Sequence, residues 1–452
     1  MDLYAPINRY IVTPLWAWHE KSPYLDIYRE LKISQYQSLN SIKEGQFIKM
    51  RKILSYAFDN SPYYRKRFQD IGIHPSDINS LDDINNIPIL TKNDLRESFD
   101  KIICMKEEQN NVRTKTTSGS TGVNVKVLLD EQSAQFKRGS VVRSDEWSGW
   151  RLGGKKAMIW GNPEYRKSLR GRIRNGLLER AKYLDTLNMS ESEMQQYAVS
   201  LHNWKPELIF GHAHSIYLFA CMLEKYNMAK INTAGIISTA MVLHEHERQK
   251  IESVFECKVT NRYGSEEVSL IASECEYHNG LHINAESLYV EFIKDGKHVG
   301  PNEPGSIVVT DLTNYAMPII RYKIGDVGSP SNVECPCGRK LPMINKIEGR
   351  VADYIYTPDK KLISGISLTE NFATLLDGVG QIQIIQDKLN HIKLNIVKNN
   401  KYSENTVKTV NELIGTHLGA QMTYDIEYVE EIPQEPSGKY RFCISKIRNP
   451  FE

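Results

Sequence analysis

This sequence has few cysteines and no long apolar runs. Only 7 of its 452 residues are cysteine, an odd and sparse set that does not suit a disulfide framework. Such usage predicts a protein of the reducing cytoplasm. No run of 18 apolar residues occurs, so we expect no transmembrane helix. The start of the chain carries Asp2, Asn8 and Arg9 and lacks an uninterrupted apolar core, which argues against a signal peptide.

An excess of charge of either sign is also missing. Lys and Arg number 57 and Asp and Glu number 55, and the net charge of +2 gives no indication of a nucleic-acid partner. With 40% hydrophobic and 25% charged residues, the composition is that of a globular protein. The length allows two or three domains and a large core.

What the sequence does contain is a run of small hydroxyl-bearing residues and glycines. The run is Thr116-Thr117-Ser118-Gly119-Ser120-Thr121-Gly122. Its glycines can take positive φ, and the backbone N–H groups of such a turn can form a concave cradle for an anion. It is not a P-loop, because no Gly-Lys-Ser/Thr follows it. Alone, the run fits a phosphate-binding loop and a flexible linker about equally well.

Apolar periodicity predicts an α/β body. Residues 1–35 are rich in aromatic side chains and irregular, and we interpret them as an ordered arm that packs on the body. A helix is predicted from Gln46, because Met50, Leu54 and Ala57 recur at spacings of four and three. Further along, strands at 207–210, 235–239 and 258–261 alternate with helices at 215–226 and 244–255. This order implies a mixed or parallel sheet covered on both faces, and ligands bind such sheets beyond the carboxyl ends of the strands.

Beyond residue 281 the pattern changes to antiparallel hairpins, and near residue 350 a smaller unit begins. The predicted elements are strands at 288–293, 306–310, 318–322, 381–386, 391–397 and 423–429 and a helix at 403–417. We therefore predict two domains, a large α/β body with a β-rich part over residues 1–350 and a small α+β domain over residues 351–452.

A basic amphipathic helix is predicted over residues 164–182. Leu169, Ile173 and Leu177 recur every four residues. The basic members are Arg166, Lys167, Arg170, Arg172, Arg174, Arg180 and Lys182. A solvated face is the favoured interpretation, and the alternatives are a dock for a phosphate-bearing acceptor or contact with an anionic membrane surface.

Four more stretches carry side chains suited to nucleotide chemistry. They are Tyr263-Gly264-Ser265-Glu266-Glu267, Tyr322-Lys323-Ile324-Gly325-Asp326, Gly349-Arg350 and Pro436-Ser437-Gly438-Lys439-Tyr440-Arg441. The first combines an aromatic face with carboxylates, and Asp326 in the second is a carboxylate suited to two vicinal hydroxyls. Each stretch alone could be a surface turn, but their order along the chain is specific.

The five stretches together resemble the adenylate-forming enzymes, a superfamily that includes acyl-CoA synthetases, the adenylation domains of peptide synthetases, and luciferase. The chain looks most like the phenylacetate–CoA ligase group and its capsular-polysaccharide CapK-type branch. The resemblance covers nearly the whole chain, including Ile53 to Arg65, Pro88 to Arg96, and His246-Glu247-Arg248. It implies a large N-terminal body and a small C-terminal domain that acts as a mobile lid.

The resemblance also implies the role of each residue. The expected nucleotide-binding residues are Thr117, Ser118, Gly119, Ser120, Thr121, Gly122, Ser238, Tyr263, Gly264, Ser265 and Asp326. Within this set the loop would hold the β- and γ-phosphates of ATP, Tyr263 would stack on adenine, and Asp326 would accept from both ribose hydroxyls. The expected catalytic residues are Glu267, which would bind Mg²⁺, Arg350, beside the ribose or phosphate, and Lys439, which would bridge the carboxylate and the α-phosphate.

Three positions depart from the pattern of the superfamily. Glu266 stands where a Thr or Ser usually precedes the magnesium ligand, so one hydroxyl contact to the α-phosphate is missing. Asn124-Val125 replaces the usual Pro-Lys after the loop. Ala352 replaces the usual hinge aspartate, with Asp353 beside it, so the switching of the hinge could differ.

A zinc site is predicted independently of the nucleotide residues. Cys275 and His278 form a C-x₂-H pair, and Cys335 and Cys337 form a C-x-C pair followed by a glycine. Three thiolates and an imidazole make a closed tetrahedral set, which is typical of structural zinc. His282 is an alternative to His278, and the opposing interpretation is a set of scattered buried cysteines and a surface histidine.

The predicted function is ATP-dependent activation of a small carboxylic acid to an acyl-adenylate, with release of pyrophosphate. The acyl group would pass to CoA, a carrier thiol, or an amine or hydroxyl of a sugar. The phenylacetate-type branch implies an aryl or short acid and CoA, whereas the CapK-type branch implies acylation during surface-polysaccharide synthesis. An amino-acid adenylating enzyme that loads a carrier is a further alternative. A non-catalytic relative would be expected to have lost Lys439, Glu267 or Asp326, and all three are present.

Overall fold

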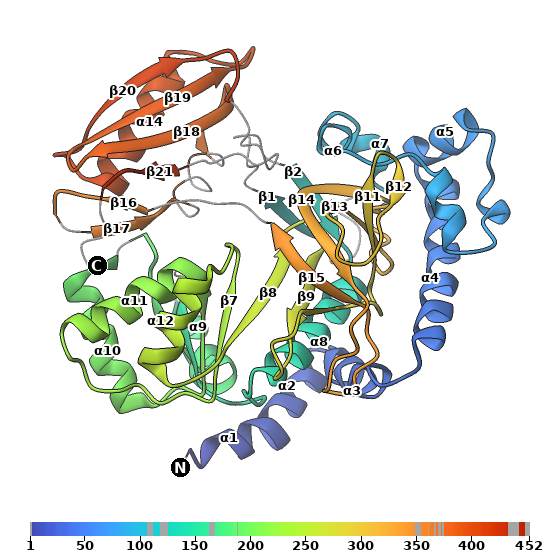
Figure 1. Ribbon diagram of the computed structural model, residues 1–452. Coiled ribbons are helices and arrows are strands. Elements are labelled where there is room, and N and C mark those ends of the chain that lie inside the picture. Colours follow the sequence, from blue (N-terminus) through green and yellow to red (C-terminus); the bar gives the residue numbers. More distant parts are fainter. Residues whose placement is uncertain are drawn as a thin grey trace.

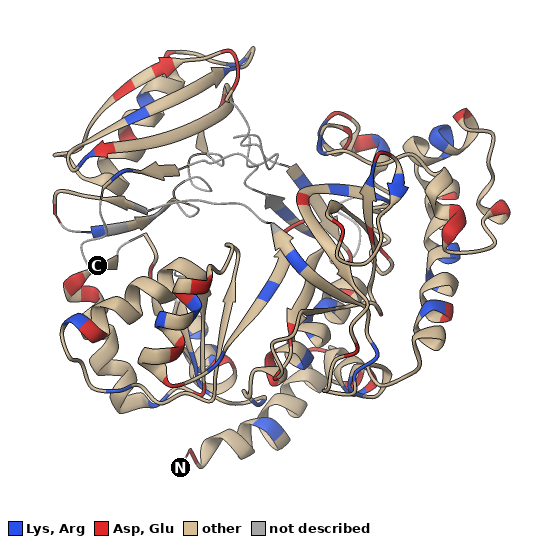
Figure 2. Ribbon diagram, viewed as in Figure 1, with Lys and Arg blue, Asp and Glu red and all other residues tan. Residues whose placement is uncertain are grey.

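The computed structural model describes residues 2–105, 112–117, 125–161, 168–187, 189–348, 354–359, 361–365, 368, 372, 375–432 and 443–447. Figure 1 shows a large body with a smaller C-terminal sheet above it and an N-terminal helix on the opposite side. Lysines and arginines are interspersed with acidic residues on the helices of the body (Figure 2), in keeping with the net charge of +2. Among the described residues, no helix combines the length and the apolar character needed to span a bilayer.

A mixed sheet of twelve strands forms the frame of the body. Its order is β12-β11-β13-β14-β15-β10-β9-β8-β7-β6-β3-β4. The strands are β3 (Lys156–Ile159), β4 (Ala181–Leu184), β6 (Leu208–His212), β7 (Gly235–Thr239), β8 (Val259–Ser265), β9 (Ser269–Glu274), β10 (Leu281–Ile283), β11 (Leu288–Lys294), β12 (Lys297–His298), β13 (Gly305–Asp311), β14 (Tyr322–Ser331) and β15 (Met343–Glu348). Strands β8, β7, β6, β3 and β4 pair in parallel, and the pairs from β8 to β12 are antiparallel, which confirms the predicted mixed α/β fold.

Helices cover the parallel half of the sheet. They are α10 (Glu191–Trp204), α11 (Ala213–Lys225) and α12 (Glu245–Phe255). Leu201, Phe219 and Phe255 pack from these helices against Ile209 and Ile236 of the strands, and all five side chains are buried. The sheet strands are short apolar runs, as expected for parallel strands that are buried on both faces.

Helices from the first part of the chain pack around the antiparallel half. They are α3 (Tyr24–Ser34), α4 (Leu39–Asn60), α5 (Pro62–Asp70), α6 (Lys92–Glu97), α7 (Phe99–Ile102) and α8 (Glu131–Trp147), with the 3₁₀ turns η2 (Pro75–Asp77) and η3 (Asp82–Asn86). Helix α4 starts earlier than predicted, because the Ser38 hydroxyl caps it by accepting from the Ser41 N–H. Ser61 then ends α4 and caps α5 through the Tyr64 N–H. A hairpin of β1 (Arg113–Thr117) and β2 (Val125–Leu129) borders the glycine/serine run.

The C-terminal part forms two further sheets. One has the order β20-β19-β18-β21, packed against α14 (Glu404–Leu418). Its strands are β18 (Val379–Lys388), β19 (His391–Lys398), β20 (Thr423–Tyr428) and β21 (Cys443–Ser445). In the other sheet, β16 (Tyr354–Tyr356) pairs with β17 (Lys361–Ser364), and β17 pairs with β5 (Met189–Ser190) of the body. This second sheet therefore joins the C-terminal part to the body.

Three predicted elements differ from the structure. Residues 1–35 are helical rather than irregular, since α1 (Tyr4–Ile7), the π-helical segment η1 (Asn8–Val12) and α2 (Thr13–His19) follow one another directly and precede α3. The basic helix is shorter than predicted: α9 (Leu169–Arg174) and η5 (Asn175–Glu179) end at Arg180, which has φ +48°, and β4 follows. The third predicted hairpin strand, 318–322, is wrong, because β14 begins at Tyr322.

Candidate active site

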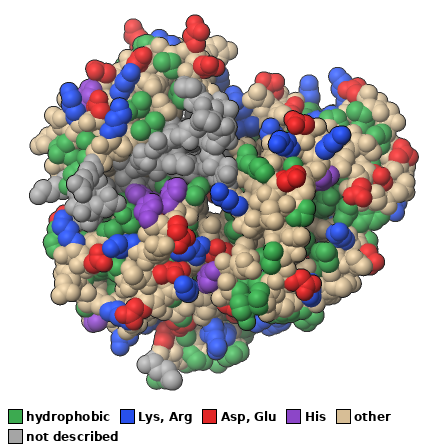
Figure 3. Space-filling model, in the orientation of Figure 1, with side chains coloured by type: hydrophobic (Ala, Val, Ile, Leu, Met, Phe, Trp, Pro, Cys, Tyr) green, Lys and Arg blue, Asp and Glu red, His purple; other side chains and the backbone are tan. Residues whose placement is uncertain are grey.

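A cavity of about 980 Å³ opens beyond the carboxyl ends of the parallel strands. The segments that follow β7 and end β8 form much of its wall, and β14 and β15 contribute from the antiparallel half. Figure 3 shows histidine side chains gathered near the middle of the face in view. The position agrees with the general rule for ligand sites in such sheets.

Asp326 and Tyr263 reach each other across this cavity. Tyr263 is on β8 and Asp326 is on β14, and the Tyr263 hydroxyl donates to Asp326 Oδ2 at 2.9 Å. The two strands are not neighbours in the sheet, so the sheet must curl to bring them together. Asp326 Oδ1 is buried and has no hydrogen-bond partner among the described residues. A buried carboxylate oxygen without a partner is costly, so this oxygen is suited to accept hydrogen bonds from a bound ligand.

Glu267 lines the same cavity just after β8. It is only 5% exposed, and the buried Tyr322 hydroxyl donates to its Oε1 at 3.0 Å. Tyr322 is itself held at the start of β14, where it pairs with Leu90. The carboxylate is therefore fixed in orientation, with its other oxygen available to a cation. Glu266, by contrast, is largely exposed and lies 3.8 Å from Lys115 Nζ.

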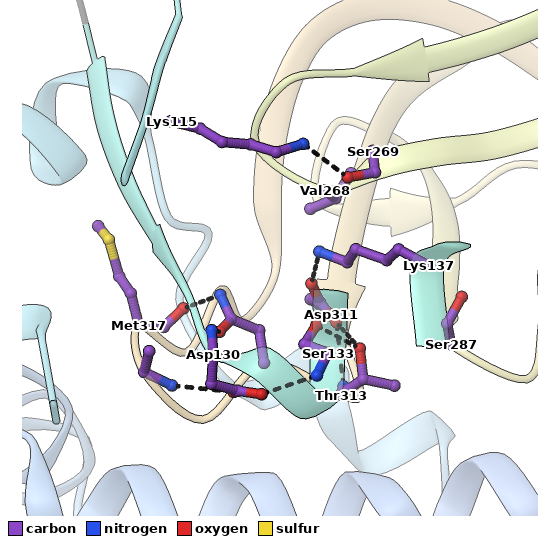
Figure 4. A network of polar contacts seen from close by, with 12 residues as sticks. Lys115, Asp130, Ser133, Lys137, Val268, Ser269, Ser287, Asp311, Thr313 and Met317 are labelled. Atoms are coloured by element: carbon purple, nitrogen blue, oxygen red, sulfur yellow. Dashed lines mark hydrogen bonds and ion pairs between the residues drawn. The ribbon is translucent and has the colours of Figure 1, made fainter. Parts of the chain in front are cut away.

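Lys115 is a cavity residue that the sequence analysis did not single out. It lies on β1, directly before the glycine/serine run, and donates to Ser269 Oγ at 3.1 Å (Figure 4). Burial lowers the pKa of its ammonium group, although the Glu266 charge opposes the shift. A lysine beside an anion-binding run could have been noted from the sequence, but only the fold shows that it faces the cavity.

A buried polar network ties the end of β2 and the start of α8 to the segment that follows β13 (Figure 4). Asp130 caps α8 by accepting from the Ser133 N–H at 2.7 Å, and its other oxygen accepts from the Tyr315 N–H at 2.6 Å. Lys137 forms a buried ion pair with Asp311 at 2.6 Å. Because these groups satisfy one another, the hairpin that borders the run rests on a rigid base.

A charged triad of Asp145, Lys156 and Arg262 lies in the wall of the cavity. Asp145 is buried and lies 2.6 Å from both Lys156 Nζ and Arg262 Nη2. Burial raises the pKa of Asp145, but the two cations outweigh burial and hold the pKa below its usual value. One carboxylate between two cations leaves this wall positive, which favours an anionic ligand.

Aromatic residues form the neighbouring part of the wall. Trp160 and Phe210 both line the cavity, and their ring centroids are 5.7 Å apart. His212 lies behind Trp160, with ring centroids 4.0 Å apart, and burial lowers its pKa to about 4. His212 is therefore neutral near pH 7, and this part of the cavity offers an apolar, aromatic surface to a small molecule.

The remaining predicted nucleotide residues differ in their placement. Gly264 and Ser265 line the cavity, and a Cβ at Gly264 would lie 2.8 Å from the Ser269 carbonyl oxygen, so only glycine fits there. Ser238 is fully buried at the end of β7 and is not among the residues that line the cavity, and its hydroxyl has no partner among the described residues. The backbone of Thr117 ends β1.

Several predicted residues lie outside the described residues. They are Ser118, Gly119, Ser120, Thr121, Gly122, Arg350 and Lys439, together with Ala352 at the predicted hinge. Their roles stay predictions.

Three cysteines and one histidine converge at the other end of β9. The candidate metal ligands Cys275, His282, Cys335 and Cys337 have their ligand atoms within 4.8 Å of one another. Cys275 Sγ lies 3.5 Å from Cys335 Sγ, and Cys337 Sγ lies 3.4 Å from His282 Nε2. Tetrahedral zinc with bonds of about 2.0 to 2.3 Å places its ligand atoms roughly 3.3 to 3.8 Å apart, so the donor set fits zinc. None of the four lines the cavity.

The predicted fourth ligand, His278, is corrected to His282. His278 has φ +51° in the turn after β9, its Nδ1 lies 3.2 Å from Glu274 Oε2, and it is not part of the group of candidate ligands. His282 lies on β10, which returns antiparallel to β9 and so carries its ring back to Cys337. Burial, with the Arg339 charge, lowers the pKa of His282 to about 4, so the ring is in the neutral form that binds metals.

Comparisons with known proteins agree with this architecture. The family model described as the CapK C-terminal domain matches residues 355–446. Protein CapK of Staphylococcus aureus is 26% identical over 444 residues, which cover 95% of this chain and 94% of that protein. The phenylacetate-coenzyme A ligase of Thermus thermophilus is 23% identical over 409 residues, with 89% and 88% of the two chains covered.

A solved structure has the same fold. It is 2-hydroxyisobutyryl-CoA ligase in complex with 2-HIB-AMP and CoA in the thioesterification state, with a TM-score of 0.63, 19% identity, and 91% of each chain covered. The predicted resemblance is thus confirmed by sequence relatives and by fold. Over most of its length the chain is similar to CapK and to phenylacetate-CoA ligases, and these findings support its predicted place among the adenylate-forming ligases, in the branch of those proteins.

Proposed function

We propose that this protein uses ATP to convert a small carboxylic acid to an acyl-adenylate and then transfers the acyl group to CoA. The observation that carries the proposal is the pair of fixed carboxylates in one cavity. Asp326 presents a buried oxygen that has no hydrogen-bond partner in the described part of the chain, and Glu267 presents an oriented carboxylate in the same cavity. The first suits the ribose hydroxyls of a nucleotide, and the second suits Mg²⁺ on its phosphates.

In the first step, a carboxylate oxygen of the acid attacks the α-phosphorus of ATP, and the bond to pyrophosphate breaks. Lys115, on the strand that enters the glycine/serine run, adds a positive charge where the phosphates would lie. In the second step, the thiolate of CoA attacks the acyl carbon, and AMP leaves. The positive triad around Asp145 and the aromatic wall of Trp160 and Phe210 support a small acid with an apolar or aromatic body.

The acceptor has alternatives. CoA is favoured because the relatives named phenylacetate-coenzyme A ligase and the 2-hydroxyisobutyryl-CoA ligase are CoA ligases by name. A carrier thiol, or a sugar hydroxyl or amine in surface-polysaccharide synthesis in the cytoplasm, is the second candidate, because the CapK-type resemblance covers nearly the whole chain.

The test supplies ATP, Mg²⁺ and CoA with a panel of aryl, short aliphatic, fatty and amino acids, and analyses the products. The proposal expects acid-dependent formation of AMP, pyrophosphate and an acyl-CoA. The isosteric variant Glu267→Gln, which keeps the bond from Tyr322, should lose at least about tenfold in rate because the magnesium ligand loses its charge. ADP as the product would exclude the proposal, and AMP without acyl-CoA would direct attention to the other acceptors.

We further propose that Cys275, His282, Cys335 and Cys337 hold one structural zinc ion. The short distances among their ligand atoms support this proposal. The cluster also joins two separate segments of the chain, the turn after β9 and the loop after β14. We also propose that residues 351–452 form a mobile lid on a body that comprises residues 1–350. The lid would bring Lys439 to the α-phosphate for the first step and would withdraw Lys439 before the acyl group is transferred.

A further inference from the structure

The N-terminal helix exposes one apolar face. Along α1, η1 and α2, the exposed large apolar residues recur at spacings of three and four. Their exposed fractions are 77% for Leu3, 46% for Ile7, 71% for Tyr10, 53% for Ile11, 60% for Leu15 and 80% for Trp18. The opposite face is made of small or polar residues, including Ala5, Asn8 and Ala17, and these are buried against the body. The large side chains therefore face away from the core, the reverse of an ordinary surface helix.

A second apolar face lies beside the first. In α9 and η5, Leu169, Ile173 and Leu177 recur every four residues and are 72%, 54% and 41% exposed. The Tyr4 hydroxyl and the Asn8 side-chain amide both donate to the carbonyl oxygen of Leu177, which fixes the two helical segments against each other. We call residues 3–18 and 169–177 together the helix pair. The helix pair thus carries nine exposed apolar side chains, whereas exposed apolar residues on an ordinary protein surface are scattered singly.

The charge around the helix pair is positive. Arg170 and Arg172 are exposed, and no ion pair between described residues involves either of them. The nearby acids are already paired: Asp2 lies 2.5 Å from Arg180, while Glu20 and Glu179 lie 3.7 and 3.8 Å from Arg174. Among the described residues, the charge that remains available at this surface is therefore cationic.

We propose that the helix pair docks the protein onto a membrane surface that contains anionic lipids. Amphipathic helices that lie in the interface combine an apolar face with arginines and with Trp and Tyr at the headgroup level, and Tyr10 and Trp18 occupy such positions on the exposed face. The Arg9 guanidinium donates to the Leu152 carbonyl oxygen at 2.7 Å, so the helix is held to the body in a fixed orientation. Charge complementarity selects lipid over a second copy of the chain, because a symmetric dimer would bring one arginine-rich edge close to another. The proposal goes beyond the acyl-transfer chemistry and does not depend on it.

The experiment is co-sedimentation of the full chain with vesicles. One set contains phosphatidylcholine alone and the other phosphatidylcholine with phosphatidylglycerol, each at low and at high salt. We expect binding to the anionic vesicles at low salt and weaker binding as salt rises. No binding to anionic vesicles at low salt would overturn the proposal.

Two variants and a matched control locate the surface. Leu15→Ser with Trp18→Ser should weaken binding by about tenfold or more, because two interfacial side chains are lost. Arg170→Gln with Arg172→Gln should weaken binding to anionic vesicles by on the order of tenfold and remove the preference over neutral vesicles. The control, Val199→Ser with Val333→Ser, changes residues that are 54% and 52% exposed elsewhere and should bind as wild type.

Two further results would contradict the proposal. One is a control variant that loses as much binding as the helix variant. The other is sedimentation of the wild type as a dimer that Leu15→Ser with Trp18→Ser converts to a monomer without affecting vesicle binding, which would make the helix pair an interface between copies. All substituted side chains are at least half exposed or polar, so the variants should keep the fold, and circular dichroism checks this.

Discussion

Replacing Asp326 should change how the protein recognises ribose more than how it recognises phosphate. One oxygen of Asp326 accepts a hydrogen bond from the Tyr263 hydroxyl at 2.9 Å, and the other is buried without a partner among the residues that the structure describes. A hydrogen bond to a charged acceptor contributes about 1.5–3 kcal/mol. At about 1.4 kcal/mol per factor of ten, one lost ribose bond corresponds to roughly a 10- to 150-fold change in affinity.

The wild type should therefore prefer ATP over 2′-deoxy-ATP by roughly 10- to 150-fold in kcat/KM. Asp326→Ala should raise the KM for ATP by at least about a hundredfold, because the bonds to both ribose hydroxyls are lost. The same variant should reduce the discrimination against 2′-deoxy-ATP to within a few-fold. The assay is acid-dependent pyrophosphate release, measured over a range of each nucleotide.

Tyr263→Phe is the matched control for this prediction. It keeps the aromatic ring in the cavity and removes only the hydroxyl that donates to Asp326. A neutral hydrogen bond contributes about 0.5–1.5 kcal/mol, so the KM for ATP should rise by only about 2- to 13-fold and the discrimination against 2′-deoxy-ATP should persist. Equal discrimination in wild type and Asp326→Ala would refute the assignment of Asp326 to the ribose.

The metal cluster, the buried ion pair and the C-terminal domain can each be tested separately. His282→Ala should remove about one zinc per chain by elemental analysis and lower the melting temperature, whereas His278→Ala should change neither, and metal-free wild-type protein of unchanged stability would exclude the zinc site. Lys137→Met leaves Asp311 buried without its partner, so urea unfolding should show a loss of about 3–5 kcal/mol, and a loss below about 1 kcal/mol would contradict the buried pair. Lys439→Ala should nearly abolish formation of the adenylate but leave transfer from a chemically made acyl-adenylate close to normal, and equal loss in both steps would exclude the lid proposal.

The strands of the parallel half could be predicted because their signal is local. The apolar run Gly235–Thr239 matches β7 at both ends, and the alternation of strands and helices gave the mixed sheet. The proximity of Tyr263 and Asp326 has no such local signal, since only the resemblance to the adenylate-forming enzymes assigns both residues to a bound nucleotide. Their bond joins β8 to β14, and no local pattern shows that a sheet curls that far.

The orientation of the N-terminal helix could not be predicted, because its large apolar residues face outward and the spacing of its inward residues is interrupted. The π-helical segment Asn8–Val12 has a longer turn than an α-helix, so the residues that face inward do not follow a 3.6-residue spacing. Small or polar residues such as Asn8 and Thr13 face the body, while Leu15 and Trp18 face outward. The outward apolar residues do recur at helical spacings of three and four, so the helix itself had a signal in the sequence, but only the structure shows which face is exposed.

The histidine of the metal cluster could not be identified from the local sequence either. The short spacing from Cys275 to His278 favours that pair in a sequence, but the turn directs His278 toward Glu274. His282 is farther along the chain and is brought to Cys337 by the pairing of β10 with β9. Cross-strand register of this kind depends on the whole sheet. The three cysteine ligands could therefore be predicted from the sequence, whereas the choice between the two histidines could not.

Exchange of labelled pyrophosphate into ATP would detect formation of an acyl-adenylate by this protein. The measurement needs no acceptor, because exchange reports reversal of the first step alone. We expect exchange that requires a carboxylic acid from the panel and Mg²⁺, and that falls at least about tenfold in Glu267→Gln. Conversion of ATP to ADP without any acid-dependent exchange, across aryl, short aliphatic, fatty and amino acids, would contradict this expectation.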